Sequence, residues 1–211
     1  MIEIEAEELS FLSWAKGAFI EGLAIFEKGG EELHRALLGV RVAGALSAEL
    51  RLFHGSRAHE LATSGALEES LLHFNVLGDP EVFVKAYTDP RSLLVKRVGS
   101  FLVVEGSYLT LLGEVLGSEQ RGDHAIVRAR LRRRALLVPS RMAPTCRALG
   151  LLVELLVRLS RVEGRSPRHD ARRLCSELRL LAEEALRLSG EAGLRRAIEL
   201  AAGRARSACG W

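Results

Sequence analysis

Aromatic residues are scarce in this chain of 211 residues, since Phe, Trp and Tyr together make up 5%. Proteins that bind single-stranded nucleic acid stack its bases on aromatic side chains, and the sequence offers no such platform. Long apolar runs are missing too: LGLLVELLV (149–157) contains Glu154 and falls short of the roughly 20 residues of a membrane-spanning helix. The acidic start MIEIEAEELS lacks the basic-then-apolar pattern of a signal peptide. We therefore expect a cytoplasmic protein without a membrane partner.

Cysteines and recognisable catalytic motifs are equally few. Cys146, Cys175 and Cys209 are odd in number and show no CxxC spacing, so neither a disulfide framework nor a zinc site is predicted. The six histidines have no metal-type spacing beside acidic residues. No GxSxG elbow, Walker loop or GxGxxG is present. We expect no metal, and the catalytic residues stay unknown at this level.

Lysine is rare, with only four among the 30 basic residues, so almost all positive charge is arginine. Within RARLRRR (128–134), Arg128, Arg130, Arg132 and Arg134 recur every second residue, and most of the positions between them and beside them are apolar. Period-two alternation is typical of a strand with one solvated face. Contact with nucleic-acid phosphates is the less favoured interpretation.

The chain divides into two halves of different pattern. Short apolar stretches separated by glycine-containing turns predict strands at 18–27, 34–42, 48–53, 70–77, 101–117 and 124–138. Helices are predicted at 78–90, 144–162, 170–190 and 191–208, with Asp79 and Asp170 as caps. Strands followed by a block of helices favour an α+β fold. We predict a β domain over 1–143 and an α-helical subdomain over 144–211.

The stretch LFHGSRAHELATSG (52–65) allows two interpretations. Ser56 suits the N-cap of a short helix, and Gly65 suits its left-handed end. Alternatively, Gly55, Ser56 and Arg57 could hold a phosphate group beside the amides of the helix start. From the residues alone, capping is favoured.

Five stretches in the same order resemble a family of uncharacterised, mostly archaeal flavoproteins, the FMN-binding split β-barrel proteins with domain of unknown function 447. They are FIEGLAIF (19–26), HRALLGVRV (34–42), LRLFHGSRAHELATSG (50–65), HFNVLGDPEVFVKA (73–86) and PTCRALGLLVELLV (144–157). The first includes Glu21, and the last places Arg147 and Glu154 in register with the family.

The resemblance implies a split β-barrel, a homodimer, and FMN bound at the subunit interface. Gly55, Ser56 and Arg57 would then serve the FMN phosphate. Gly39 and Val40 would offer main chain to the edge of the flavin ring. Asn75 and Arg147 are further candidates for polar contacts. On this basis phosphate binding becomes the favoured interpretation of the turn.

The sequence also departs from the family pattern. The threonines usual after Glu21 are missing, Leu61 stands where asparagine often follows the phosphate turn, and Cys146 precedes Arg147. Each change removes a hydrogen-bonding group. Two hypotheses follow: an FMN-dependent oxidoreductase-like flavoprotein of unknown substrate, or a non-catalytic dimeric binding or scaffold protein with an eroded flavin site.

Overall fold

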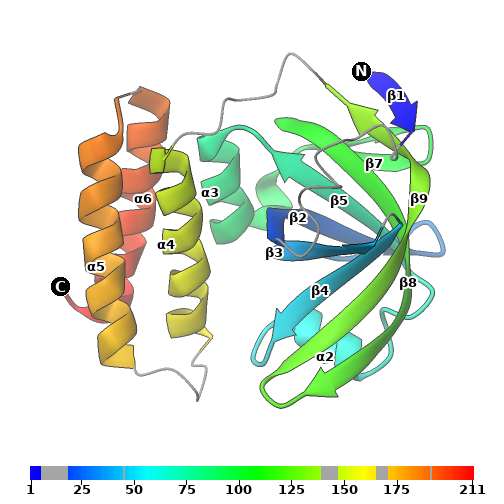
Figure 1. The fold of residues 1–211 in the computed structure, drawn as a ribbon, viewed down its shortest axis with the longest axis horizontal. Coiled ribbons are helices and arrows are strands. Elements are labelled where there is room, and N and C mark those ends of the chain that lie inside the picture. The colour runs from blue at the N-terminus through cyan, green and yellow to red at the C-terminus, as the bar shows by residue number, and fades with distance from the viewer. Residues whose placement is uncertain (6–18, 45, 139–146, 165–170, 191) are drawn as a thin grey trace.

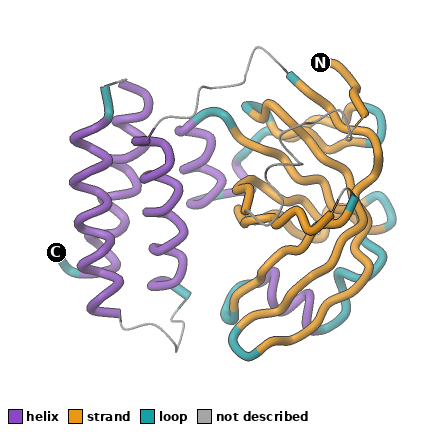
Figure 2. The backbone as a smooth tube through the Cα atoms, viewed as in Figure 1, coloured by secondary structure: helices purple, strands orange, loops and turns teal. Residues whose placement is uncertain are grey.

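The computed structural model describes residues 1–5, 19–44, 46–138, 147–164, 171–190 and 192–211. The strands form a barrel, and the carboxyl-terminal helices stand together on one side of it (Figure 1). Figure 2 shows the same division, with the short α2 (Arg57–Thr63) on the strand side. This confirms the predicted α+β fold, a β-barrel with a carboxyl-terminal helical part.

Six strands of the described residues close the barrel, all paired antiparallel. They are β2 (Phe19–Lys28), β3 (Glu31–Gly44), β4 (Ser47–Phe53), β5 (Leu71–Leu77), β8 (Ser107–Arg121) and β9 (His124–Leu137). Their order is β9-β4-β3-β2-β5-β8, and β8 pairs with β9 as well. That last pairing joins the two ends of the sheet into a closed barrel.

Side chains alternate between the barrel interior and its outer face. Ala24 and Phe26 of β2 and Val40 of β3 belong to the interior cluster. Leu23 and Ile25, on the other face of β2, belong to the cluster that the helices share. β2 is therefore apolar on both faces, because one face fills the barrel and the other carries the helices.

Three shorter strands complete the β part of the described chain. β1 (Ile2–Glu5) adds to the barrel along β9, and β6 (Val95–Val98) with β7 (Phe101–Val104) makes a separate hairpin. The sequence predicts one strand over 101–117, but the structure divides it into β7 and β8. Gly106 separates them at φ +94°, a left-handed conformation that favours glycine. β1 and β6 were not predicted, being only four residues long.

The helices begin near the predicted signals. α3 (Pro80–Thr88) starts after Asp79, whose Oδ1 accepts the Glu81 N–H at 2.8 Å, as the sequence predicts. A 3₁₀ turn, η2 (Pro90–Ser92), follows. The long helices are α4 (Arg147–Glu163), α5 (Ala171–Leu188) and α6 (Ala192–Cys209). The predicted cap Asp170 lies outside the described residues.

The long helices share one apolar cluster with the outer face of the barrel. Leu152, Leu155 and Leu159 of α4 are fully buried there beside Leu23 and Ile25. α2 instead contributes Ala58 and Ala62 to the interior cluster, so it covers part of the barrel interior. The proposed domain boundary at 143/144 lies outside the described residues and stays a prediction.

The prediction about cysteine is wrong at one point. Cys175 of α5 and Cys209 of α6 form a disulfide. They are 34 residues apart in sequence, and their Cα atoms lie 5.6 Å apart because the two helices pack against each other. Only that packing brings them together, so the spacing carried no signal. Cys146 lies outside the described residues.

Candidate functional site

The Gly-Ser turn joins β4 to α2. Ser56 is the N-cap of α2: its Oγ accepts the His59 N–H at 3.1 Å and donates to the Phe53 carbonyl at 2.9 Å. Gly55 has φ +86°, and a Cβ there would lie 3.1 Å from the Gly164 carbonyl oxygen at the end of α4. The capping interpretation is therefore confirmed, and the turn packs closely against α4.

Arg57 begins α2 on the solvent side. Its Nη1 donates to Glu60 at 2.9 Å, and both side chains are exposed. Such a pair contributes little to stability. The phosphate role of Gly55, Ser56 and Arg57 stays a prediction, and the structure shows that the Ser56 hydroxyl and the Arg57 guanidinium already have partners.

Gly39 and Val40 lie on opposite faces of β3. The Val40 side chain is buried inside the barrel. Gly39 pairs with Glu21 of β2, and a Cβ on its outer face would lie 2.6 Å from Glu21 Oε1 and 3.1 Å from Phe19 Cδ1. The Glu21 carboxyl group therefore lies over the bare backbone of Gly39, and Phe19 borders it.

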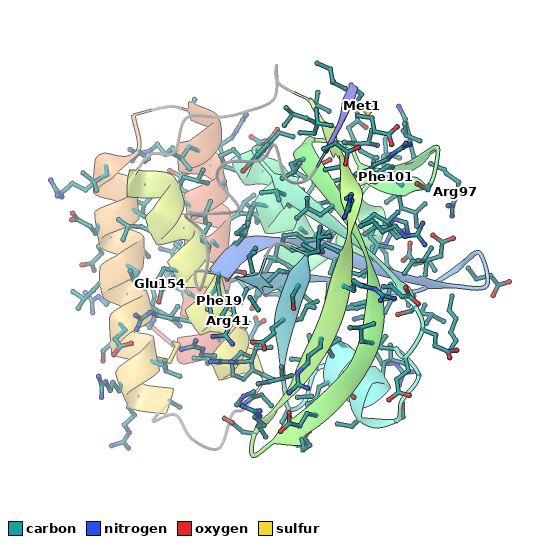
Figure 3. The ribbon with its side chains drawn as sticks, turned by 45° about the vertical axis from the view of Figure 1, so that its right-hand side comes forward. Met1, Phe19, Arg41, Arg97, Phe101 and Glu154 are labelled. Carbon is teal, nitrogen blue, oxygen red and sulfur yellow. A yellow bond between two sulfur atoms is a disulfide. The ribbon has the colours of Figure 1, made fainter. Side chains whose placement is uncertain are left out.

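α4 presents a charged stripe at this point. Glu154, Arg158 and Arg161 recur at a spacing of four and three residues, which places them on one helix face. Arg158 bonds to Glu154 at 2.7 Å and also to Glu177 of α5. Figure 3 shows Glu154 on α4 where the helix faces Phe19 and Arg41 of the barrel.

Arg161 differs from its neighbour Arg158 because no carboxylate forms an ion pair with it among the described residues. Its guanidinium carbon lies 5.7 Å from the centre of the Phe53 ring, a cation–π distance. Its Nε is buried and has no hydrogen-bond partner in the described structure. An unpaired buried donor costs free energy, so its presence calls for an explanation.

These residues form one cluster, which we call the α4 junction: Glu21, Gly39, Phe53, Glu154 and Arg161. Burial and, to a smaller extent, the negative charge of Glu154 raise the pKa of Glu21 from 4.5 to about 7, against the opposing effect of Arg161. The junction thus brings together a carboxyl group that titrates near neutral pH, an arginine whose buried Nε has no hydrogen-bond partner in the described structure, and the glycine backbone that the carboxyl group covers.

Two further arginines lie on the same outer face. Arg41 of β3 is paired with Glu49 of β4. Arg51 of β4 lies 5.4 Å over the Phe19 ring. The face of β2, β3 and β4 nearest α4 is therefore rich in guanidinium groups, of which Arg41 is neutralised by its partner.

The structure does not bring Asn75 to this junction. Its side chain is fully buried on β5 and makes four hydrogen bonds, to the His73 and Leu102 carbonyls and from the Val104 N–H and Thr110 hydroxyl. These bonds fasten the β6–β7 hairpin to the barrel. The flavin contact expected of Asn75 stays a prediction, and all four polar positions of its amide are in use.

A buried ionic network lies beside Asn75. His73 Nε2 donates to Glu27 at 2.7 Å, because His73 Nδ1 accepts the Leu102 N–H at 3.0 Å. Arg97 also bonds to Glu27, at 2.7 Å. Burial lowers the pKa of His73 despite its bond to Glu27, so the ring is neutral and serves to hold the hairpin.

Arg147 is the first residue of α4, two turns before Glu154, and its side chain lies outside the described residues. Arg161 and Phe53 were not among the predicted site residues. The spacing of Glu154, Arg158 and Arg161 on an otherwise apolar helix could have indicated Arg161. Nothing in the sequence linked Phe53 to α4.

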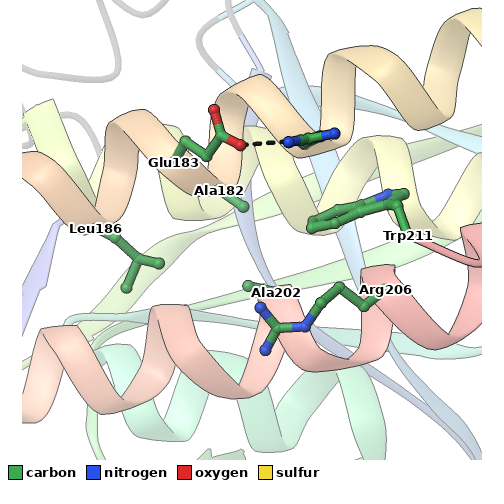
Figure 4. A pocket seen from close by; sticks show the side chains of 7 residues that line it. Ala182, Glu183, Leu186, Ala202, Arg206 and Trp211 are labelled. Atoms are coloured by element: carbon green, nitrogen blue, oxygen red, sulfur yellow. Dashed lines mark hydrogen bonds and ion pairs between the residues drawn. The ribbon is translucent and has the colours of Figure 1, made fainter.

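Other features of the described chain are less suited to a site. A cavity of about 360 Å³ between α5 and α6 is lined by Ala182, Leu186, Ala202, Arg206 and Trp211 (Figure 4); its ion pair Arg179–Glu183 is satisfied, and its unpartnered buried polar atom is Trp211 Nε1, an uncharged donor. No group of three or more metal-binding side chains is placed for a metal ion among the described residues. None of the helices described here has the length and apolar character needed to cross a membrane.

The arginine stripe of β9 is exposed, as predicted from its period. Three of its members pair with carboxylates: Arg128 with Glu119, Arg130 with Glu114 and Arg134 with Glu3. These pairs offset much of the charge that a nucleic-acid phosphate would need.

No protein-family model matches the sequence, and no curated protein matches it significantly. Among solved structures, the chain is similar to the FMN-bound protein MM1853 from Methanosarcina mazei, whose family model is domain of unknown function 447. The two are 19% identical with a TM-score of 0.65, over 93% of this chain and 99% of the other. The predicted resemblance to that family is thereby confirmed in the fold.

Flavin reductases of known structure are similar to a smaller part of this chain. The styrene monooxygenase flavin reductase from Pseudomonas putida S12 is 18% identical with a TM-score of 0.44, over 62% of this chain and 85% of its own. Flavin reductase HpaC, complexed with NADP⁺, is 12% identical with a TM-score of 0.44, over 59% of this chain and 83% of its own.

Proposed function

We propose that this chain is an FMN-binding flavoprotein and that the α4 junction and the neighbouring Gly-Ser turn hold the cofactor. The observation that carries the proposal is Arg161, whose buried Nε lacks a partner beside that turn. Arginine binds phosphate through a planar fork of donors. A flavin phosphate near the turn would give this guanidinium the anion that the protein does not supply.

The residues present fit such a group in two respects. Arg161 Nε has no hydrogen-bond partner among the described residues, and Gly39 has no side chain of its own on the outer face of β3, where the Glu21 carboxyl group covers its backbone. The fold shared with an FMN-bound protein over 93% of this chain supports the proposal. FMN would supply the redox chemistry, and the protein would bind and orient it. We propose an oxidoreductase-like, cytoplasmic homodimer with the cofactor at the subunit interface.

The test is the absorption spectrum of the purified protein, before and after adding FMN and desalting. Flavin bands that survive desalting are expected from the wild type. Arg161→Gln should weaken FMN binding at least tenfold, because a charged hydrogen bond contributes about 1.5–3 kcal/mol. Arg187→Gln is the matched control, because Arg187 lies on the distant helix α5 and is paired with Glu184 there. This variant should bind FMN as the wild type does.

Two variants of the Gly-Ser turn test whether its side chains contribute to FMN binding. Ser56→Ala should weaken FMN binding and cost about 1 kcal/mol of stability from the lost cap. Arg57→Ala should weaken FMN binding with little effect on folding, because its only described partner is the exposed Glu60. Unchanged affinity in both variants would locate the phosphate elsewhere.

A second candidate function is a dimeric binding or scaffold protein with an eroded flavin site. The observation that favours it is that the Ser56 hydroxyl and the Arg57 side chain already have partners within the protein. Leu61, at the position of the family's asparagine, packs against the barrel interior cluster. A protein that is colourless and takes up no FMN would support this alternative and refute the first.

A further inference from the structure

Glu21 occupies the place that any ligand of Gly39 must touch. Its Oε1 lies 2.6 Å from where a Cβ of Gly39 would stand, directly over that backbone. A molecule that contacts the outer face of Gly39 therefore contacts the Glu21 carboxyl group or displaces it. No hydrogen bond or ion pair holds this carboxyl among the described residues, so its charge is poorly compensated.

The charged groups around Glu21 come from three elements. Glu154 and Arg161 face it from α4, with opposite effects on its charge. Arg41 of β3 is tied to Glu49. Arg51 of β4 lies over the ring of Phe19, the neighbour of Glu21. Arg161 is thus the cation that offsets the Glu21 charge most directly, and it is also the proposed phosphate ligand.

We propose that Glu21 is the proton-exchanging residue of the α4 junction and takes up one proton when FMN binds there. This inference rests on the proposed function. Two effects drive it in the same direction. The bound molecule removes water from the carboxyl group, which disfavours its charged form. The phosphate also engages Arg161, which withdraws the cation that stabilises the Glu21 carboxylate.

The coupling has a calculable size. Without ligand, the pKa of Glu21 is about 7, so most molecules carry a charged Glu21 at pH 8. If the proton stays on in the complex, FMN binding weakens by up to tenfold per pH unit above 7, or on the order of 50-fold between pH 7 and 9. The second ionisation of a phosphate monoester lies near pH 6 and is complete in this range.

The experiment is calorimetric titration of the whole protein with FMN at pH 8, in Tris and in HEPES. The difference in heat between two buffers gives the number of protons taken up. The wild type should take up close to one proton per FMN, and Glu21→Gln should take up close to one fewer. Glu114→Gln is the matched control, because Glu114 is exposed and paired with Arg130 on β9, and it should match the wild type.

A second measurement covers the case in which Glu21→Gln folds poorly. Glu154→Gln removes the like charge and lowers the pKa of Glu21. In a plot of FMN affinity against pH, the bend above which affinity falls should therefore move to lower pH. Equal proton uptake by the wild type and Glu21→Gln, or an unmoved bend in Glu154→Gln, would overturn the inference while FMN binding stands. Failure of FMN to bind the wild type would refute the proposed function itself and this inference with it.

Discussion

Replacing Glu21 by glutamine should stabilise the ligand-free protein above neutral pH. Burial and Glu154 raise the pKa of this carboxyl from 4.5 to about 7. The folded state therefore holds the proton more tightly than the unfolded chain does. The tighter proton binding of Glu21 stabilises the folded state. This stabilisation is fully present below pH 4.5 and is lost as the pH rises through 7. A shift of this size corresponds to about 2–3 kcal/mol, allowing for partial solvent exposure.

The measurement is thermal unfolding of the wild type and Glu21→Gln at pH 5 and pH 8. Glutamine has nearly the same shape and no charge, so the variant should be more stable at pH 8, by about 5–10 °C in Tm for a chain of this size. The advantage should shrink toward pH 5. Glu114→Gln, an exposed paired carboxylate, should change Tm by only about 1–2 °C. Equal melting temperatures at pH 8, or an advantage that grows toward pH 5, would refute the reasoning about buried charge.

Two further predictions concern residues that hold the fold. Asn75→Ala should destabilise the protein by about 2–4 kcal/mol in denaturant unfolding, because the Val104 N–H and the Leu102 carbonyl lose their partner; a loss below about 1 kcal/mol would mean that water replaces these bonds. Reducing the Cys175–Cys209 disulfide should lower stability by about 2–4 kcal/mol, since it closes a loop of 34 residues, and Cys209→Ser should abolish any effect of reductant on the unfolding curve.

The sequence predicted the elements whose signals are local. Asp79 before Pro80 predicted the start of α3, and Ser56 predicted the cap of α2, because a cap acts within three residues. The alternation of β9 also appeared as predicted, since a strand with one solvated face repeats every two residues. β1 and β6 could not be predicted, because four residues are too few to show a period.

The candidate site was predictable only in part. The Gly-Ser turn was a candidate from its residues and Gly39 only from a resemblance; the structure places Gly55 against Gly164 at the end of α4 and Gly39 under Glu21. Arg161 came from neither route, because its meaning depends on Phe53, more than a hundred residues earlier in the chain. The Cys175–Cys209 disulfide failed for the same reason, since it depends on how α5 packs on α6. Both features depend on contacts between residues that are far apart in the sequence.

The two apolar faces of β2 impose an order on synthesis and folding. Its inner face can be covered once β9 is made, because β9 joins β4 to β8 and closes the barrel. Its outer face, with Leu23 and Ile25, waits for α4 and the helices after it. A nascent chain that has released residue 138 but not yet residue 163 therefore exposes these apolar side chains on a closed barrel. Chaperones that bind emerging chains have their clearest target on this protein during that interval.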